Sequence, residues 1–376
     1  MCIRDRYGLL AFAQSFINYF LILTDFGFNL SASREVAIHR EKKGKLTEIF
    51  CSVMFAKFGL LLLSMVTMLI VVFTFEKFRQ NWIIYLFAFV RVIGNVLFPS
   101  WFFQGMERMK YVTFLNIAIK LISTVLIFVI IRHPTDYLYV PLINSFGYLV
   151  ADSISLWMVF RYFGIKAYIP TRSQILHYLK DSWQYFLSRV SVSIYTSSNA
   201  FVLGLFSTDL MTGYYASAEK LYTILTGAYE PISGSLYPYM SRLRNISLYK
   251  RLFSVVCLLN LIVCILSFAF APQILSLVLG ADYPISIDIF RIFLVSAVFL
   301  VPSVMLGYPF VAALGYPKYA NASVVISSLV HILGLLILGI TTSVNVYTVA
   351  VLVVVSGFVT LFVRVFAILK HNLWIQ

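Results

Sequence analysis

The sequence predicts an all-α membrane protein that crosses the bilayer many times. Hydrophobic residues make up 61% of its 376 residues and charged residues only 12%, far from the balance of soluble domains. A run of about 20 apolar residues is long enough to cross the hydrocarbon layer as a helix. Eleven such runs, joined by short loops, cover residues 7–31, 49–73, 81–103, 112–131, 138–161, 184–206, 212–239, 252–271, 288–313, 318–340 and 345–369.

The loops between these runs alternate between basic and nearly uncharged. The loop at 32–48 holds five arginines and lysines, and every second loop after it is also basic, whereas the loops between hold three cations in all. Cytoplasmic loops carry such an excess. We therefore expect the basic loops and the C-terminus to face the cytoplasm. This asymmetry explains the net charge of +14, so no nucleic-acid partner is expected.

An odd number of crossings places residue 1 outside the cell. Nothing at the start resembles a signal peptide, and Arg4 and Arg6 would lie on the unfavourable side. We therefore expect a chain truncated at its N-terminus by about one helix, from a parent with twelve helices and both ends inside. The alternative is a protein of eleven spans with an external N-terminus.

A coarse internal repeat relates the two halves. A shift of about 205 residues lays 212–239 on 7–31 and 318–340 on 112–131, with the same orientation. Parallel repeats are a known transporter plan, with the substrate site between the halves. The predicted fold is thus an all-α two-lobe transporter, with eleven of twelve helices.

The predicted division has an N-terminal lobe at 1–166 that lacks its first helix, and a C-terminal lobe of six helices at 184–376. Between them, residues 167–183 are expected to form a short amphipathic helix on the cytoplasmic leaflet, because apolar side chains recur there at helical spacing. No loop is long enough for a soluble domain.

Cations buried in the predicted spans are the main functional signal. Lys57, Arg91, Lys120 and Arg189 lie six or more residues from either span end, and placing four charges at that depth costs roughly 10–14 kcal/mol. We expect them to line a water-filled interior that binds an anionic substrate. Lys57, Lys120 and Arg189 could instead extend to the cytoplasmic interface.

Three further cations, Lys220, Arg291 and Arg364, lie near span ends, where extension to the interface is the favoured interpretation. Arg291 is nevertheless kept among the candidates for substrate binding.

Four acidic residues lie in or at the edges of spans: Asp25, Asp152, Glu219 and Glu230. Each could carry a proton or a sodium ion during transport, or neutralise a nearby arginine.

Four prolines are expected to interrupt helices and free backbone carbonyls: Pro99, Pro231, Pro302 and Pro309.

Other chemistry is sparse. The four cysteines form no CxxC pair, the five histidines have no metal-ligand spacing, and no phosphate-binding glycine loop occurs. We therefore expect neither an enzyme nor a bound cofactor or metal, apart from coupling to a proton or sodium gradient.

Three motifs carry a family resemblance. Residues 23–35 (LTDFGFNLSASRE), 98–110 (FPSWFFQGMERMK) and 213–221 (GYYASAEKL) resemble signatures of bacterial polysaccharide (O-antigen) flippases, the Wzx-type branch of the MOP exporter superfamily. Family members have twelve helices in two lobes and a cationic lumen, so the resemblance implies a MATE-like transporter fold. Alignment with them starts this chain at the second helix.

The resemblance implies transfer of an undecaprenyl-diphosphate-linked oligosaccharide, an intermediate of O-antigen and lipopolysaccharide synthesis, across the bacterial inner membrane. It also implies a glycan polymerase and a chain-length regulator as pathway partners. Two alternatives stay open: a drug antiporter of the same superfamily, whose cavity should be acidic, and a membrane glycan polymerase or ligase. The latter usually needs a large periplasmic loop, and the longest outward loop here has about 16 residues (272–287).

Overall fold

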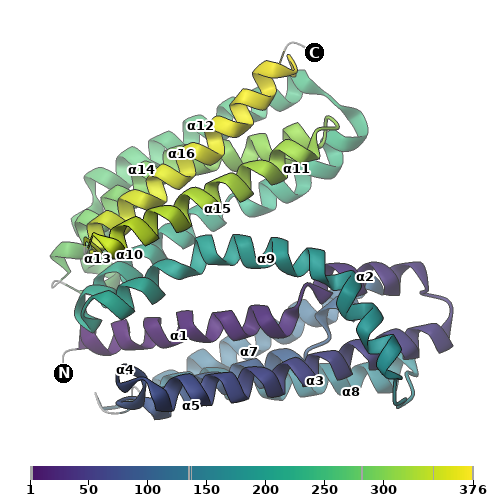
Figure 1. Cartoon of the computed structure of the whole chain (residues 1–376). Helices are drawn as coiled ribbons and strands as arrows, with labels where there is room; N and C mark the ends of the chain where they lie inside the picture. The colour runs from purple at the N-terminus through teal and green to yellow at the C-terminus, as the bar shows by residue number, and fades with distance from the viewer. Residues whose placement is uncertain (1–2, 134–135, 137, 281–282, 342, 375–376) are drawn as a thin grey trace. The chain divides into compact units, whose positions relative to one another are not determined.

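The computed structural model describes residues 3–133, 136, 138–280, 283–341 and 343–374. These residues are almost entirely helical (Figure 1). The first half of the chain contains α1 (Ile3–Asp25), α2 (Phe28–Ile38), α3 (Lys43–Thr74), α4 (Glu76–Arg79), α5 (Trp82–Leu97), α6 (Ser100–Gly105), α7 (Met109–Ile130), α8 (Tyr139–Phe163) and α9 (Arg172–Phe206). The second half contains α10 (Asp209–Gly227), α11 (Glu230–Leu243), α12 (Ile246–Ala269), α13 (Ala271–Leu279), α14 (Pro284–Leu306), the π-helical turn η2 (Gly307–Ala312), α15 (Pro317–Ile340) and α16 (Val346–Lys370).

The chain divides into two compact units. Residues 13–193 form one, here called the N-terminal unit, and residues 1–12 with 194–376 form the other, the C-terminal unit. In the first, α5 packs against α8 and α3, and α2 packs against α6; in the second, α14 and α15 pack against α16, and α14 also contacts α10 and α12. The lobe boundaries drawn from the sequence stay a prediction.

The helices are those of a polytopic membrane protein, as predicted. Among the described residues, eight helical segments are long and apolar enough to cross a membrane. Many of their leucine, isoleucine and phenylalanine side chains are exposed, most of all on α12 and α15. Such surfaces are stable only in lipid. The expected total of eleven spans stays a prediction.

Residues 172–183 do not form a separate helix before the next predicted span. They form the first third of α9, which continues without a break to Phe206. Thr171 precedes this helix, and its backbone N–H and hydroxyl both donate to the Gln174 side chain.

Several helices break inside the predicted spans. The run at 7–31 is interrupted at Phe26 and Gly27, which both have positive φ, and a Cβ on Gly27 would lie 2.7 Å from the Cβ of Tyr185. Glycine is therefore required there by both the backbone and the close approach of α9.

Prolines mark further breaks, as predicted. Pro99 lies between α5 and α6, Pro231 is the second residue of α11, and Pro309 lies in the π-helical turn η2. Pro302 differs, because it lies inside α14 without ending it. A proline within a helix removes one backbone donor and so frees a carbonyl for other partners.

The signature at 98–110 lies in the core of the N-terminal unit. Trp101, Phe102 and Phe103 are fully buried, and Phe50 of α3 packs against the rings of Trp101 and Phe102. Aromatic side chains of this size dominate packing energy. These three aromatic residues therefore belong to the packed core of the N-terminal unit.

Arg364 corrects one expectation. Its side chain is only 5% exposed and does not extend to the interface. The guanidinium donates to the Ser323 hydroxyl at 2.8 Å and to the backbone carbonyl of Ser303, and it fills the space left by Gly307, where a Cβ would lie 2.6 Å from the arginine. Arg364 thus joins α14, α15 and α16.

We expect Arg364→Ala to lower the free energy of unfolding by roughly 2–4 kcal/mol, because charge-assisted hydrogen bonds are lost and a cavity remains. Thermal unfolding of the purified protein in detergent measures this. Arg251→Ala, at an exposed position near the start of α12, is the matched control and should unfold like the unaltered protein. Equal melting of both variants would contradict the structural role of Arg364.

Candidate functional site: a buried charge cluster in the N-terminal unit

Lys57 lies in the middle of α3 with its ammonium group buried. Its side chain is 2% exposed, and Nζ donates to the backbone carbonyl of Asn95 at 3.0 Å. That carbonyl is available because the residue four positions later is Pro99, which has no N–H to donate. The proline at the end of α5 therefore creates the acceptor for the lysine.

Asp152 on α8 lies near two of the four predicted cations in this unit. It is 4% exposed and interacts electrostatically with Lys57 and Arg91. Its Oδ2 atom lies 2.8 Å from the position that a Cβ on Gly94 would occupy, so the glycine makes room for the carboxylate. Arg91, one turn before Gly94 on α5, lies over the ring of Tyr148 with its Cζ 5.0 Å from the ring centroid.

Asp25 adds a second carboxylate at the end of α1. It interacts electrostatically with Lys57, and its Oδ1 accepts a hydrogen bond from the Asn29 amide. The amide oxygen of Asn29 in turn accepts from the Ser100 hydroxyl at 2.7 Å. The break at Phe26 and Gly27 makes this possible, since it turns α2 so that Asn29 reaches back to Asp25 and across to α6.

Lys57, Arg91, Asp25 and Asp152 define what we call the charge cluster. It brings together two of the five predicted substrate-binding cations and two of the four predicted coupling acids. Two cations and two carboxylates balance in formal charge. Such a cluster can take up a proton or a monovalent cation on a carboxylate, and its cations can bind an anion when a carboxylate is neutralised or displaced.

Gly94 tests the packing of the cluster. We expect Gly94→Ala to lower the free energy of unfolding by about 1–3 kcal/mol, because the new methyl group would press on Asp152 and on the α8 backbone at Leu149, 3.3–3.4 Å away. Gly59→Ala is the control, since its Cβ would meet nothing within 4 Å. Unfolding of both variants in detergent measures the difference, and a harmless Gly94→Ala would contradict the close approach.

No described contact joins the remaining predicted cations to the cluster. Lys120 on α7 is exposed, and no described contact joins it to the cluster. The side chain of Arg189 lies outside the described residues. Arg291 belongs to the C-terminal unit, where it lies 3.8 Å from Asp288 and over the ring of Phe268.

The two remaining acidic candidates also lie in the C-terminal unit. Glu219 on α10 interacts electrostatically with Tyr215 and Tyr7. Glu230, the first residue of α11, is exposed. The structure therefore does not join all four acids in one site.

A buried polar chain in the C-terminal unit was not predicted. The two ring nitrogens of His331 lie 2.8 Å from Asn199 Oδ1 and 2.8 Å from the Ser356 hydroxyl. His331 is fully buried on α15, and the depth of this histidine in an apolar run was the only signal in the sequence. Its partners come from α9 and α16, so no spacing along the chain could identify them.

One ion pair outside the predicted spans joins the loop after α2 to the signature segment at 98–110. Arg40, after α2, contacts Glu107 at 2.9 Å and donates to the Gly105 carbonyl at 3.0 Å. The hydrogen bond from Arg40 holds the pKa of the Glu107 carboxyl below its usual value. Because both groups are solvent-exposed, the pair positions the loop more than it stabilises the fold.

Two curated proteins are similar to most of the chain. A protein named "Putative O-antigen transporter" from Escherichia coli (strain K12) is 27% identical over 292 residues, which cover 76% of this chain and 68% of the relative. A protein of the same name from Shigella dysenteriae is 23% identical over 340 residues, covering 88% and 83% of the two chains.

Solved structures show the same fold. An inward-facing multidrug resistance MATE family transporter of the MOP superfamily matches with a TM-score of 0.72 at 14% identity, over 98% of this chain and 93% of the other. The lipid II flippase MurJ in its inward closed conformation matches with a TM-score of 0.68 at 17% identity, over 98% and 84%. The names of these relatives are those of transporters and a flippase, which agrees with the prediction of a non-enzyme.

The family resemblance drawn from the motifs is confirmed by a match over most of the chain. The model of the family described as "Polysaccharide biosynthesis protein" matches residues 4–244, which include the three motifs and the whole charge cluster. The chain therefore belongs to the polysaccharide biosynthesis protein family and has the fold of MATE family transporters.

Proposed function

We propose that this protein moves lipid-linked oligosaccharide repeat units from the cytoplasmic to the periplasmic leaflet of a bacterial inner membrane. Support comes from the family match, from relatives named for O-antigen transport, and from a fold shared with a lipid II flippase. The observation that carries the proposal is the burial of Lys57 beside the half-buried Arg91 within a span region that otherwise contains mainly apolar side chains.

The proposed substrate is an undecaprenyl-diphosphate-linked oligosaccharide. Its diphosphate is an anion that cannot enter hydrocarbon unaided, and arginine and lysine bind phosphate oxygens strongly in a low-dielectric site. Transfer of two negative charges outward across an inside-negative potential is favourable by roughly 4.6 kcal/mol per 100 mV. The prenyl tail can remain in lipid during transfer.

The carboxylates of the charge cluster could couple this transport to a proton or sodium gradient. Asp25 and Asp152 neutralise the cations while no substrate is bound, which lowers the cost of burying charge. Protonation of Asp152, or sodium binding to it, would leave Lys57 and Arg91 with excess positive charge and favour uptake of the anionic headgroup. Release of the ion and of the substrate would then restore the paired cluster, as the protein alternates between inward- and outward-facing states.

The other candidate residues enter the proposal in supporting roles. Lys120 and Arg189 would attract acidic sugars, and Glu219 and Glu230 are further candidates for ion coupling. The C-terminus is placed in the cytoplasm by the loop charges. A glycan polymerase and a chain-length regulator would act on the exported units.

The test is complementation of a host strain that lacks its own O-antigen transporter. Expression of this protein should restore surface glycan and remove the lipid-linked repeat units that accumulate on the cytoplasmic leaflet. The assay separates the alternatives, because a polymerase would leave the repeat units on the cytoplasmic leaflet and a drug antiporter would change drug resistance without moving glycan. Persisting accumulation with the protein present in the membrane would contradict the proposal.

A further inference from the structure

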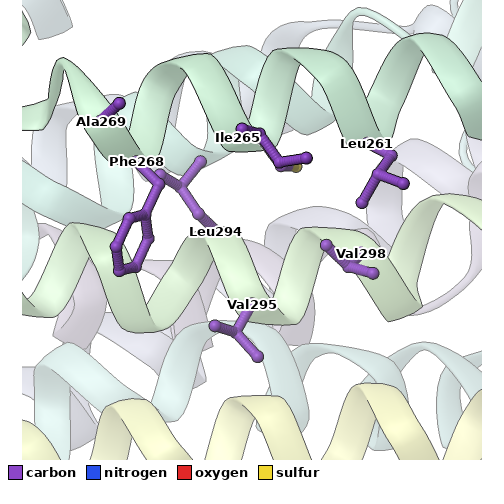
Figure 2. A pocket seen from close by; sticks show the side chains of 8 residues that line it. Leu261, Ile265, Phe268, Ala269, Leu294, Val295 and Val298 are labelled. Carbon is purple, nitrogen blue, oxygen red and sulfur yellow. The ribbon is translucent and has the colours of Figure 1, made fainter.

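The C-terminal unit has an apolar groove between α12 and α14. Figure 2 shows side chains of these two neighbouring helices along its walls. Its volume is about 280 Å³. The lining residues are all apolar or weakly polar: Leu261, Cys264, Ile265, Phe268, Ala269, Leu294, Val295 and Val298.

The groove has a buried floor and an open side. Cys264 and Leu294 are 4% and 1% exposed, whereas Ile265, Phe268 and Val295 are each more than two-fifths exposed. Both helices are candidate membrane spans, and only 17% of the most apolar window of α12 is buried within the protein. The medium that fills the open side of this groove is therefore the hydrocarbon of the bilayer.

A cation lies at one end of the groove. The guanidinium of Arg291 lies over the ring of Phe268, with Cζ 5.2 Å from the centroid, one residue from the end of α12. The Arg291 Nε–H is buried and has no hydrogen-bond acceptor among the described residues. Its only described ion pair, to Asp288, joins NH1 at 3.8 Å and leaves that Nε donor unused.

We propose that this groove binds an anionic phospholipid, with one acyl chain between α12 and α14 and the phosphate on Arg291. The groove offers hydrocarbon contacts along about two helical turns, and the Arg291 side chain at its end is 36% exposed, so its guanidinium can donate to a phosphate oxygen. In the orientation proposed from the loop charges, the headgroup lies in the outer leaflet. This lipid site is distinct from the charge cluster and does not depend on the proposed transport function.

In this proposal Arg291 binds a lipid phosphate, whereas the sequence analysis kept it among the candidates for substrate binding. An arginine two turns into a span is costly in hydrocarbon unless an anion or water reaches it. Its stacking on Phe268 directs it along the surface of the groove, so a lipid headgroup can reach it from the bilayer.

Native mass spectrometry of the purified full chain tests the proposal, with phosphatidylglycerol and phosphatidylcholine added in equal amounts. We expect the protein to retain phosphatidylglycerol about fivefold over phosphatidylcholine, since one cation near the headgroup contributes about 1 kcal/mol. Arg291→Gln should remove this preference and leave chain binding. Val295→Trp, which fills the open side of the groove, should lower retention of both lipids.

Arg251→Gln, at the exposed start of α12, is the matched control and should keep the preference. Thermal unfolding in detergent shows whether each variant is folded. Equal retention of the two lipids by the unaltered protein would overturn the proposal, as would an unchanged preference in folded Arg291→Gln. Displacement of phosphatidylglycerol by a long-chain polyprenyl diphosphate at a lower concentration would overturn the choice of occupant.

Discussion

Replacing Lys57 with methionine should abolish export of lipid-linked repeat units. Methionine keeps the length of the side chain but removes the charge that faces Asp25 and Asp152 and the bond to the Asn95 carbonyl. If the ammonium group is needed to exchange a carboxylate for a diphosphate, no neutral side chain replaces it. Surface glycan in the complemented transporter-deficient strain measures export, and membrane protein is quantified alongside.

Lys120→Met is the matched control for this experiment. It removes the same charge from an exposed position on α7 without touching the cluster, so export should fall by less than about twofold. Normal glycan in Lys57→Met at equal protein would contradict a role for the cluster in transport. An equal loss in both variants would show that general positive charge, and not the buried position, matters.

Asp152→Asn should partly restore the stability that Lys57→Met loses. The single lysine variant leaves the half-buried Asp25 and the buried Asp152 with Arg91 as the one remaining cation of the cluster, and should unfold with a free energy lower by roughly 3–5 kcal/mol. Neutralising Asp152 removes one of them, so the double variant should be more stable than Lys57→Met alone by about 1–3 kcal/mol. Export should stay absent, because the ammonium group is still missing.

Thermal unfolding of the four proteins of this cycle in detergent measures the coupling. The cycle separates two reasons for lost export, since a double variant that is folded and stable but inactive shows that Lys57 acts in transport. Additive effects, within about 0.5 kcal/mol, would contradict the electrostatic contact between Lys57 and Asp152.

The sequence predicted the class of fold because a bilayer imposes long apolar runs, and the runs at 49–73, 252–271 and 345–369 correspond closely to α3, α12 and α16. The break at Gly27 was not predicted, since apolar residues continue across it and hydropathy does not record a change in backbone direction. The break at Pro99 could be predicted, because proline has no backbone N–H to donate within a helix.

The site was only partly predictable. The distance of a charged residue from the ends of its span can be counted in the sequence, but the residues of other helices that contact it cannot be identified there. Lys57 and Arg91 were identified by their distance from span ends, but the sequence left open which acidic residues, if any, would neutralise them. The structure places Asp25 and Asp152 beside them, from helices about 32 and 95 residues away in the chain from Lys57. The expectation for Arg364 was wrong because its position near a span end suggested extension to the interface. The sequence does not show that Gly307 of another helical segment leaves space for the guanidinium.

The most direct measurement of the central claim is the leaflet distribution of lipid-linked repeat units in transporter-deficient cells that express Arg91→Ala. Arg91 is half-buried beside Asp152 and Tyr148, where it can meet a diphosphate as the carboxylate is neutralised. We expect the unaltered protein to place repeat units in the periplasmic leaflet and Arg91→Ala to leave them in the cytoplasmic leaflet at equal protein level. Equal periplasmic fractions in the two strains would contradict the assignment of the charge cluster as the anion-binding site.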